Sequence, residues 1–198
     1  GGARSGHGVA RIAGVYVGGE VMARGVQGAK KYGAVVLGLR RDGGGVPRTA
    51  EERFASARRI VRRAEEYGIP RRKVMIDTLV LTASAEQALV SETVRALSMV
   101  RTLGVQTALG VSNVSFGLPN RPLLNKPFLT MAMTSGLNMP ILNPLDGEMT
   151  GAVRAYNVLA NLDAGAADYI EAYRDFTPAA QTTAAVRREG TTPAADLY

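Results

Sequence analysis

The chain contains no cysteine and no tryptophan, and its single histidine is His7. These absences exclude a disulfide scaffold, a thiolate nucleophile and a zinc site built from cysteine and histidine. No apolar run approaches the ~18 residues that a membrane-spanning helix needs, and the first residues lack the apolar core of a signal peptide. We therefore expect a cytoplasmic protein without a metal site and without membrane contact.

The composition that remains is typical of one globular domain, because 198 residues with 46% hydrophobic residues are enough to bury a core. The net charge is +7, and eleven basic residues lie between Arg40 and Lys73 beside five acidic ones. Such a cluster fits either a nucleic-acid surface or the solvated face of a helix. The interleaved acids and the lack of aromatic stacking partners favour the solvated face, and so no nucleic-acid partner.

Strand-like and helix-like segments alternate along the chain. Short β-branched apolar runs predict strands at residues 9–16, 34–39, 74–81, 105–111 and 139–143. Helical patterns cover residues 19–32, 49–67, 84–104, 123–135, 148–162 and 166–176. The clearest helix begins with a capping box of Thr49 and Glu52 and ends at Gly68.

This alternation predicts an α/β fold in which helices pack on a parallel sheet. An open doubly wound sheet and a piece of a (β/α)₈ barrel both fit, and in both the site lies at the carboxyl ends of the strands. We expect the domain to span residues 9–176. Residues 1–8 are predicted to be a disordered end, and residues 177–198, rich in Thr, Ala and Pro, a linker or disordered tail.

Polar residues lie within or directly after three of the predicted strands. Asp77 ends the run VMID, and a carboxylate can accept two hydrogen bonds from a planar N–H/NH₂ edge; capping of the next loop is the alternative role. Asn113 follows LGVS and offers a donor and an acceptor without titrating near neutral pH. Asn143 ends the last strand. Because neighbouring strand ends meet in a parallel sheet, these side chains are expected to line one pocket.

The segments KKYGAVVLGL, RRKVMIDTLVLTASA, LGVSNVSFGLPNRPLLN and NPLDGEMTGAVRAYN resemble the pterin-binding (methyltetrahydrofolate) domain of cobalamin-dependent methionine synthase and related corrinoid–folate methyltransferases. GVSNVSFGLPNR is the most specific part. The resemblance implies a partial (β/α)₈ TIM barrel of about five βα units that lacks the first three. Ala13 stands where the family has an asparagine. NPLDGEM, in place of a basic motif, argues against a dihydropteroate-synthase-like enzyme.

The resemblance also implies a function. The family binds 5-methyltetrahydrofolate and passes its methyl group to cob(I)alamin on a separate cobalamin-binding domain during methionine synthesis. By resemblance, Asp77 binds the pterin's amino-pyrimidinone edge and Asn113 is the catalytic residue near N5. Gly110 and Ser112 belong to the same motif as Asn113, and Asn143 lines the pocket. The alternative is an inactive barrel fragment with a structural role, or a homo-oligomer joined through open barrel edges.

Overall fold

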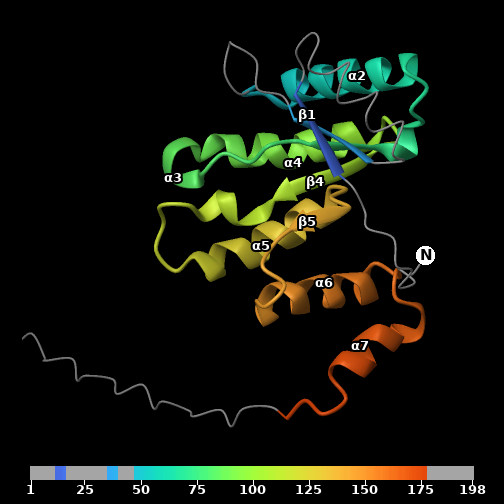
Figure 1. Cartoon of the computed structure of the whole chain (residues 1–198). Coiled ribbons are helices and arrows are strands. Elements are labelled where there is room, and N and C mark those ends of the chain that lie inside the picture. Colours follow the sequence, from blue (N-terminus) through green and yellow to red (C-terminus); the bar gives the residue numbers. More distant parts are fainter. Residues whose placement is uncertain (1–11, 17–34, 40–46, 178–198) are drawn as a thin grey trace, which may run out of the picture.

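The computed structural model describes residues 12–16, 35–39 and 47–177 (Figure 1). Within them, five parallel strands form one sheet in the order β1-β2-β3-β4-β5. The strands are β1 (Ile12–Tyr16), β2 (Val35–Leu39), β3 (Val74–Asp77), β4 (Gln106–Gly110) and β5 (Met139–Ile141). Each lies inside a predicted strand range. The predicted end 1–8, the helix 19–32 and the tail beyond Thr177 lie outside the described residues.

The described helices follow the predicted ranges closely. They are α2 (Ala50–Glu66), α3 (Ala83–Glu86), α4 (Ala88–Arg101), α5 (Arg121–Thr134), α6 (Gly147–Leu159) and α7 (Ala167–Ala172), with 3₁₀ turns at Arg71–Lys73, Val111–Ser115 and Ala164–Ala166. The helix expected over 84–104 is divided into α3 and α4. Among the described residues, no helix is both long enough and apolar enough to cross a bilayer.

The capping of α2 is the one predicted from the sequence. The Thr49 hydroxyl accepts a hydrogen bond from the Glu52 amide, and the Glu52 carboxylate accepts one from the Thr49 amide, both at 3.2 Å. At the other end Gly68 has φ 74°, a left-handed conformation that glycine adopts without steric cost. Local sequence therefore fixes both ends of this helix.

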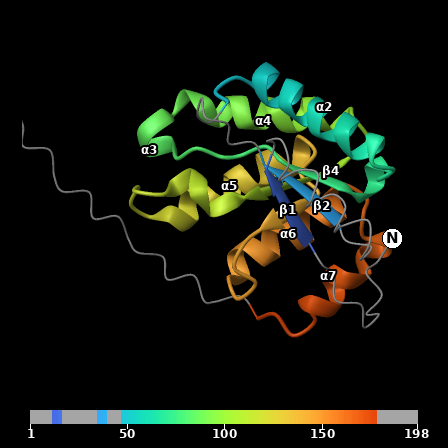
Figure 2. The same cartoon turned by 45° about the horizontal axis from the view of Figure 1, so that its top comes forward.

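The strand order bears on the choice between the two predicted architectures. Neighbours in the sheet are neighbours in the chain throughout. A doubly wound sheet reverses its order at a switch point, whereas a barrel wall does not. Helices α2, α4, α5 and α6 follow one another in the same order as the strands (Figures 1 and 2). The observed arrangement is consistent with part of a barrel.

The helices pack on one face of the sheet. Val74 and Ile76 of β3 share a buried cluster with Ile60 of α2, and Leu109 of β4 shares a second cluster with Leu129 of α5. Ile76 of β3 pairs with Thr107 of β4, so their side chains point to the same face of the sheet. Leu109 is two residues beyond Thr107 and shares that face, so both clusters lie on one side of the sheet. The helix-covered face thus contains the core.

The opposite face is open at the β5 edge. By alternation it carries Met75 and Asp77 of β3 and Gln106, Ala108 and Gly110 of β4, of which Met75 and Ala108 are buried. Met139 pairs with Ala108 and Ile141 with Gly110, and their side chains are 43% and 53% exposed. We call this surface the open face. In a parallel α/β fold its edge at the carboxyl ends of the strands is where ligands bind.

Candidate functional site

Asp77 is the last residue of β3 and lies on the open face. Its Oδ1 accepts a hydrogen bond from the Leu79 amide at 2.8 Å, forming a turn in which the side chain bonds the backbone two residues on. Oδ2 has no hydrogen-bond partner among the described residues. Burial raises the pKa of Asp77, and the bond from Leu79 opposes that rise in part. The loop-capping role and an outward binding role are therefore both compatible with this one carboxylate.

Next to Asp77, the strand β4 carries small residues on the open face, and the longer side chain of Gln106 lies opposite Met75. Ala108 pairs with Asp77, and Gly110 follows two residues later on the same face. A Cβ added to Gly110 would lie 2.9 Å from Nδ2 of Asn113, so the Asn113 amide rests against the strand end and would have to shift if Gly110 carried a side chain. Asp77 and Asn113 therefore border the end of β4 at Gly110, which is half-buried and projects no side chain, whereas Ala108 is buried.

The loop that carries Asn113 is fixed by a hydrogen-bond network below it. Ser115 is fully buried, and its hydroxyl donates to Asn125 Oδ1 at 2.7 Å and accepts from Arg121 Nε at 3.0 Å. Arg121 Nη2 also donates to the Ser112 carbonyl at 2.7 Å. The Ser112 backbone thus supports the loop, while its exposed side chain makes no hydrogen bond within the described part of the chain.

The loops that follow β3 and β4 are also joined to each other. The hydroxyls of Thr82 and Ser84 both donate to the Phe116 carbonyl, at 2.5 and 2.9 Å. These bonds connect the segment after Asp77 with the segment after Asn113. Neither Thr82 nor the Ser115 network is identifiable from the sequence as part of the site, because their partners are 6 to 34 residues away along the chain.

Asn143 lies two residues beyond β5 and is exposed. Its Oδ1 accepts a hydrogen bond from the Leu145 amide at 3.0 Å, which is the same type of turn as at Asp77. Ile141 pairs with Gly110, so the sheet brings the ends of β3, β4 and β5 to one edge, as expected. Asp77, Asn113 and Asn143, all within the described residues, make no hydrogen bond to one another.

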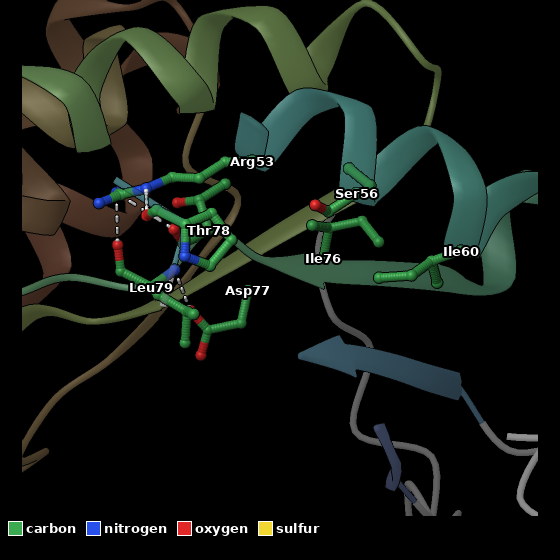
Figure 3. Close-up of a pocket in the computed structure, with 9 residues that line it drawn as sticks. Arg53, Ser56, Ile60, Ile76, Asp77, Thr78 and Leu79 are labelled. Carbon is green, nitrogen blue, oxygen red and sulfur yellow. Dashed lines mark hydrogen bonds between the residues drawn. The ribbon is translucent and has the colours of Figure 1, made fainter. Parts of the chain in front are cut away.

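Arg53 of α2 corrects the expectation that the basic cluster is a solvated surface. Its side chain is 4% exposed and reaches the turn after Asp77, where Nη1 donates to the Thr78 and Leu79 carbonyls at 3.3 and 2.9 Å (Figure 3). The sequence signal was its position, four residues before Ala57 and seven before Ile60, on the buried stripe of α2. Other members of the cluster are exposed and form ion pairs: Arg48 with Glu86, Arg63 with Glu66, and Arg71 with Glu65.

The chemistry available at this edge is hydrogen bonding. It offers a carboxylate and a neutral amide, and the described residues contain no group of three His, Cys, Asp or Glu side chains suited to a metal ion. Asp77 can accept from a donor edge, and Asn113 can donate or accept. Such a set binds a flat heterocycle better than it performs nucleophilic catalysis.

The chain is similar to a known protein family and to several curated proteins. A family model described as pterin binding enzyme matches residues 34–143. The methylcorrinoid:tetrahydrofolate methyltransferase of Eubacterium limosum is 28% identical over 135 residues, which are 67% of this chain and 50% of that protein. The methionine synthases of Mycobacterium tuberculosis and Mycobacterium leprae are each 32% identical over 122 residues, 57% of this chain and 10% of theirs. The chain therefore spans half or less of these relatives.

Proposed function

The chain belongs to the pterin binding enzyme family, and on that premise we propose that it binds 5-methyltetrahydrofolate for methyl transfer in a corrinoid-dependent reaction. The observation that carries the proposal is the Asp77 carboxylate on the open face. One of its oxygens is fixed by the Leu79 amide, and the other has no partner among the described residues. The printed names of the relatives, a methylcorrinoid:tetrahydrofolate methyltransferase and two methionine synthases, support a folate ligand.

The pterin edge would be held by Asp77. An amino-pyrimidinone presents an N–H and an NH₂ side by side, and a carboxylate is the side chain that accepts from both. The raised pKa of Asp77 has burial as its main cause, and a ligand that donates to the carboxylate relieves that cost of desolvation. Gly110, two residues beyond the partner of Asp77 and without a side chain, would leave room for the ring at the strand end.

Asn113 would lie near N5 of the bound pterin. A methyl group on a neutral amine is a poor electrophile, so a hydrogen bond or a proton at N5 must develop by the transition state. An amide serves here because it can donate or accept whatever the protonation state of N5. Gly110 and Ser112 would support Asn113 indirectly. Gly110 leaves room for the Asn113 amide, and the Ser112 carbonyl anchors the loop by accepting a hydrogen bond from Arg121. Asn143 would line the far side of the pocket.

The corrinoid partner would approach the open face. Its cobalt supplies the nucleophile, so the chain needs no nucleophilic side chain of its own. The transfer is proposed from folate to cob(I)alamin on a separate cobalamin-binding domain, in methionine synthesis. The name of the Eubacterium limosum relative states the opposite direction, and a site that orients N5 serves both. The sheet would form part of a (β/α)₈ barrel wall, whose open edge at β5 is the place for a further strand or a second copy.

The first test is calorimetric titration of the purified chain with 5-methyltetrahydrofolate, after circular dichroism has established that it is folded. We expect saturable binding that is weakened about tenfold or more by Asp77→Ala and by Asn113→Ala, since each removes hydrogen bonds to the ring. Addition of cob(I)alamin to the folate complex then tests methyl transfer, followed through the cobalt absorbance.

Asp163→Ala is the matched control. Asp163 also accepts backbone hydrogen bonds, from Asp168 and Tyr169, but it follows α6 and therefore lies toward the opposite end of the sheet. Its loss should leave folate binding unchanged. A folded chain that produces no heat with the folate, or one in which the three variants behave alike, would overturn the proposed function.

A further inference from the structure

Leu79 adopts an unfavourable backbone conformation directly beside the candidate site. Its φ is 60°, in the left-handed region that a branched residue occupies only when its surroundings hold it there. Both of its peptide groups are engaged. The Leu79 amide donates to Asp77 Oδ1 at 2.8 Å, and the Leu79 carbonyl accepts from Arg53 Nη1 at 2.9 Å and from Thr93 Oγ1 at 3.2 Å.

The burial of the charged Arg53 side chain against the sheet is energetically unfavourable. Burial lowers the pKa of its guanidinium, only partly offset by the charges of Glu92 and Glu52. Its donors serve neutral acceptors: the Pro47, Thr78 and Leu79 carbonyls and the Thr93 hydroxyl. Nη2 is buried without a partner, and so is Thr78 Oγ1; both residues line a cavity of about 10 Å³, which has room for about one water molecule. A packing role alone would be served as well by an apolar side chain.

We propose that Arg53 is a positioning residue of the folate site: it holds Leu79 in its left-handed conformation and thereby aims the Asp77 carboxylate at the open face. Figure 3 shows the arrangement, with Arg53 bonded to the turn on one side and the Asp77 carboxylate pointing to the other. The ligand in this statement rests on the proposed function, whereas the connection from Arg53 through Leu79 to Asp77 rests on the hydrogen bonds alone.

The effect is transmitted by geometry rather than by charge. Arg53 bonds the turn and not the carboxylate, and the shift at Asp77 arises from burial and the Leu79 amide. Opposite Met75–Asp77, β4 presents Gln106, Thr107 and Ala108, none of which titrates. Among described charged side chains, Arg53 of α2 is therefore the one that shares the turn. A lysine, which keeps the charge but lacks the planar fork, should not replace it.

The first measurement is the carboxyl titration of Asp77, followed by ¹³C NMR in the unliganded chain and assigned with Asp77→Asn. In Arg53→Met we expect the Asp77 midpoint to move to higher pH, because the carboxylate loses the Leu79 amide, which is the bond that lowers its pKa. Arg53→Lys should move it in the same direction. Arg59→Met, an exposed arginine on the same helix, is the matched control and should leave the titration unchanged.

The second measurement is folate affinity in a rescue experiment. Arg53→Met should weaken binding about tenfold, the value of a well-placed hydrogen bond to the ring. Leu79→Gly alone should change it little, because glycine adopts φ 60° without strain. The double variant Arg53→Met/Leu79→Gly should recover most of the lost affinity, because glycine adopts the left-handed conformation without the hydrogen bond from Arg53. A purely structural role for Arg53 predicts lower stability with an unchanged titration and no rescue.

Thr93→Val provides a second, milder test that can be used if Arg53→Met fails to fold. It removes one acceptor of Arg53 and one donor to the Leu79 carbonyl while Arg53 stays in place, so a smaller shift in the same direction is expected. An unchanged Asp77 titration in both variants overturns the proposal. If the parent chain does not bind folate, the proposed function fails, and the NMR titration still decides whether Arg53 orients Asp77.

Discussion

The turns after β3 and β5 share one local geometry and differ in what surrounds it. In each, a side-chain oxygen accepts the amide two residues on, at 2.8 Å for Asp77 and 3.0 Å for Asn143. The turn at Asp77 is half-buried, braced by Arg53 from α2 and carries a charge, whereas Asn143 is exposed and neutral. The same local turn thus occurs in two environments: tertiary contacts partly bury and brace the one at Asp77 and leave the one at Asn143 exposed.

Exchanging the side chains of the two turns should produce the largest effect. Asp77→Asn keeps the turn acceptor but loses the charge that accepts two hydrogen bonds, so folate affinity should fall by about a hundredfold. Asn143→Asp adds the charge where nothing orients it and should change affinity less than about threefold. Calorimetry on both variants measures the contrast. Equal losses would mean that the two turns contribute alike.

Moving Asn113 without replacing it should have the next largest effect. In Gly110→Ala the new methyl group would lie 2.9 Å from the Asn113 amide nitrogen, so the amide must shift away from the strand end. We expect folate affinity to drop about tenfold. Gly147→Ala is the control, since a Cβ there meets nothing within 4 Å. The prediction is wrong if the two alanine variants bind folate with the same affinity.

The two turns should also differ in how they affect the pH dependence of the free energy of unfolding of the unliganded chain. The folded-state pKa of Asp77 is raised by burial, so its charged form disfavours folding, and this cost disappears as the pH falls below that pKa. Asp77→Asn should therefore be more stable than the parent at pH 7, with a difference that closes in acid. Asn143→Asp should lack this pattern. Urea unfolding at several pH values measures both, and a difference that grows in acid would contradict the assignment.

The smallest effect is expected at the exposed turn itself. Asn143→Ala removes one solvent-accessible hydrogen bond to the Leu145 amide and should lower the free energy of unfolding by about 0.5 kcal/mol. Thermal unfolding followed by circular dichroism is sufficient. A loss several times larger would show that contacts beyond this one hydrogen bond stabilise the β5 turn.

Much of the fold was predictable because it depends on neighbours in the chain. The five strands, the Thr49–Glu52 capping box and the left-handed Gly68 follow from local patterns, and the structure confirms them. The division between α3 and α4 was missed, since no proline or glycine marks it. The basic cluster was misjudged at Arg53, because composition counts charges and does not register that this position belongs to the buried stripe of α2.

The sequence by itself determined the elements, the family resemblance and the residue types at the strand ends: Asp77, Asn113 and Asn143. The tertiary structure decided which of them carries a partly buried charge, that Gly110 makes room for the Asn113 amide, and that Arg53 reaches the turn after Asp77. The physical reason is the distance along the chain over which each interaction acts. Capping and periodicity act over a few residues, whereas desolvation and the bonds from Arg53 to Leu79 join groups 26 positions apart, which only the packing of α2 on the sheet brings together.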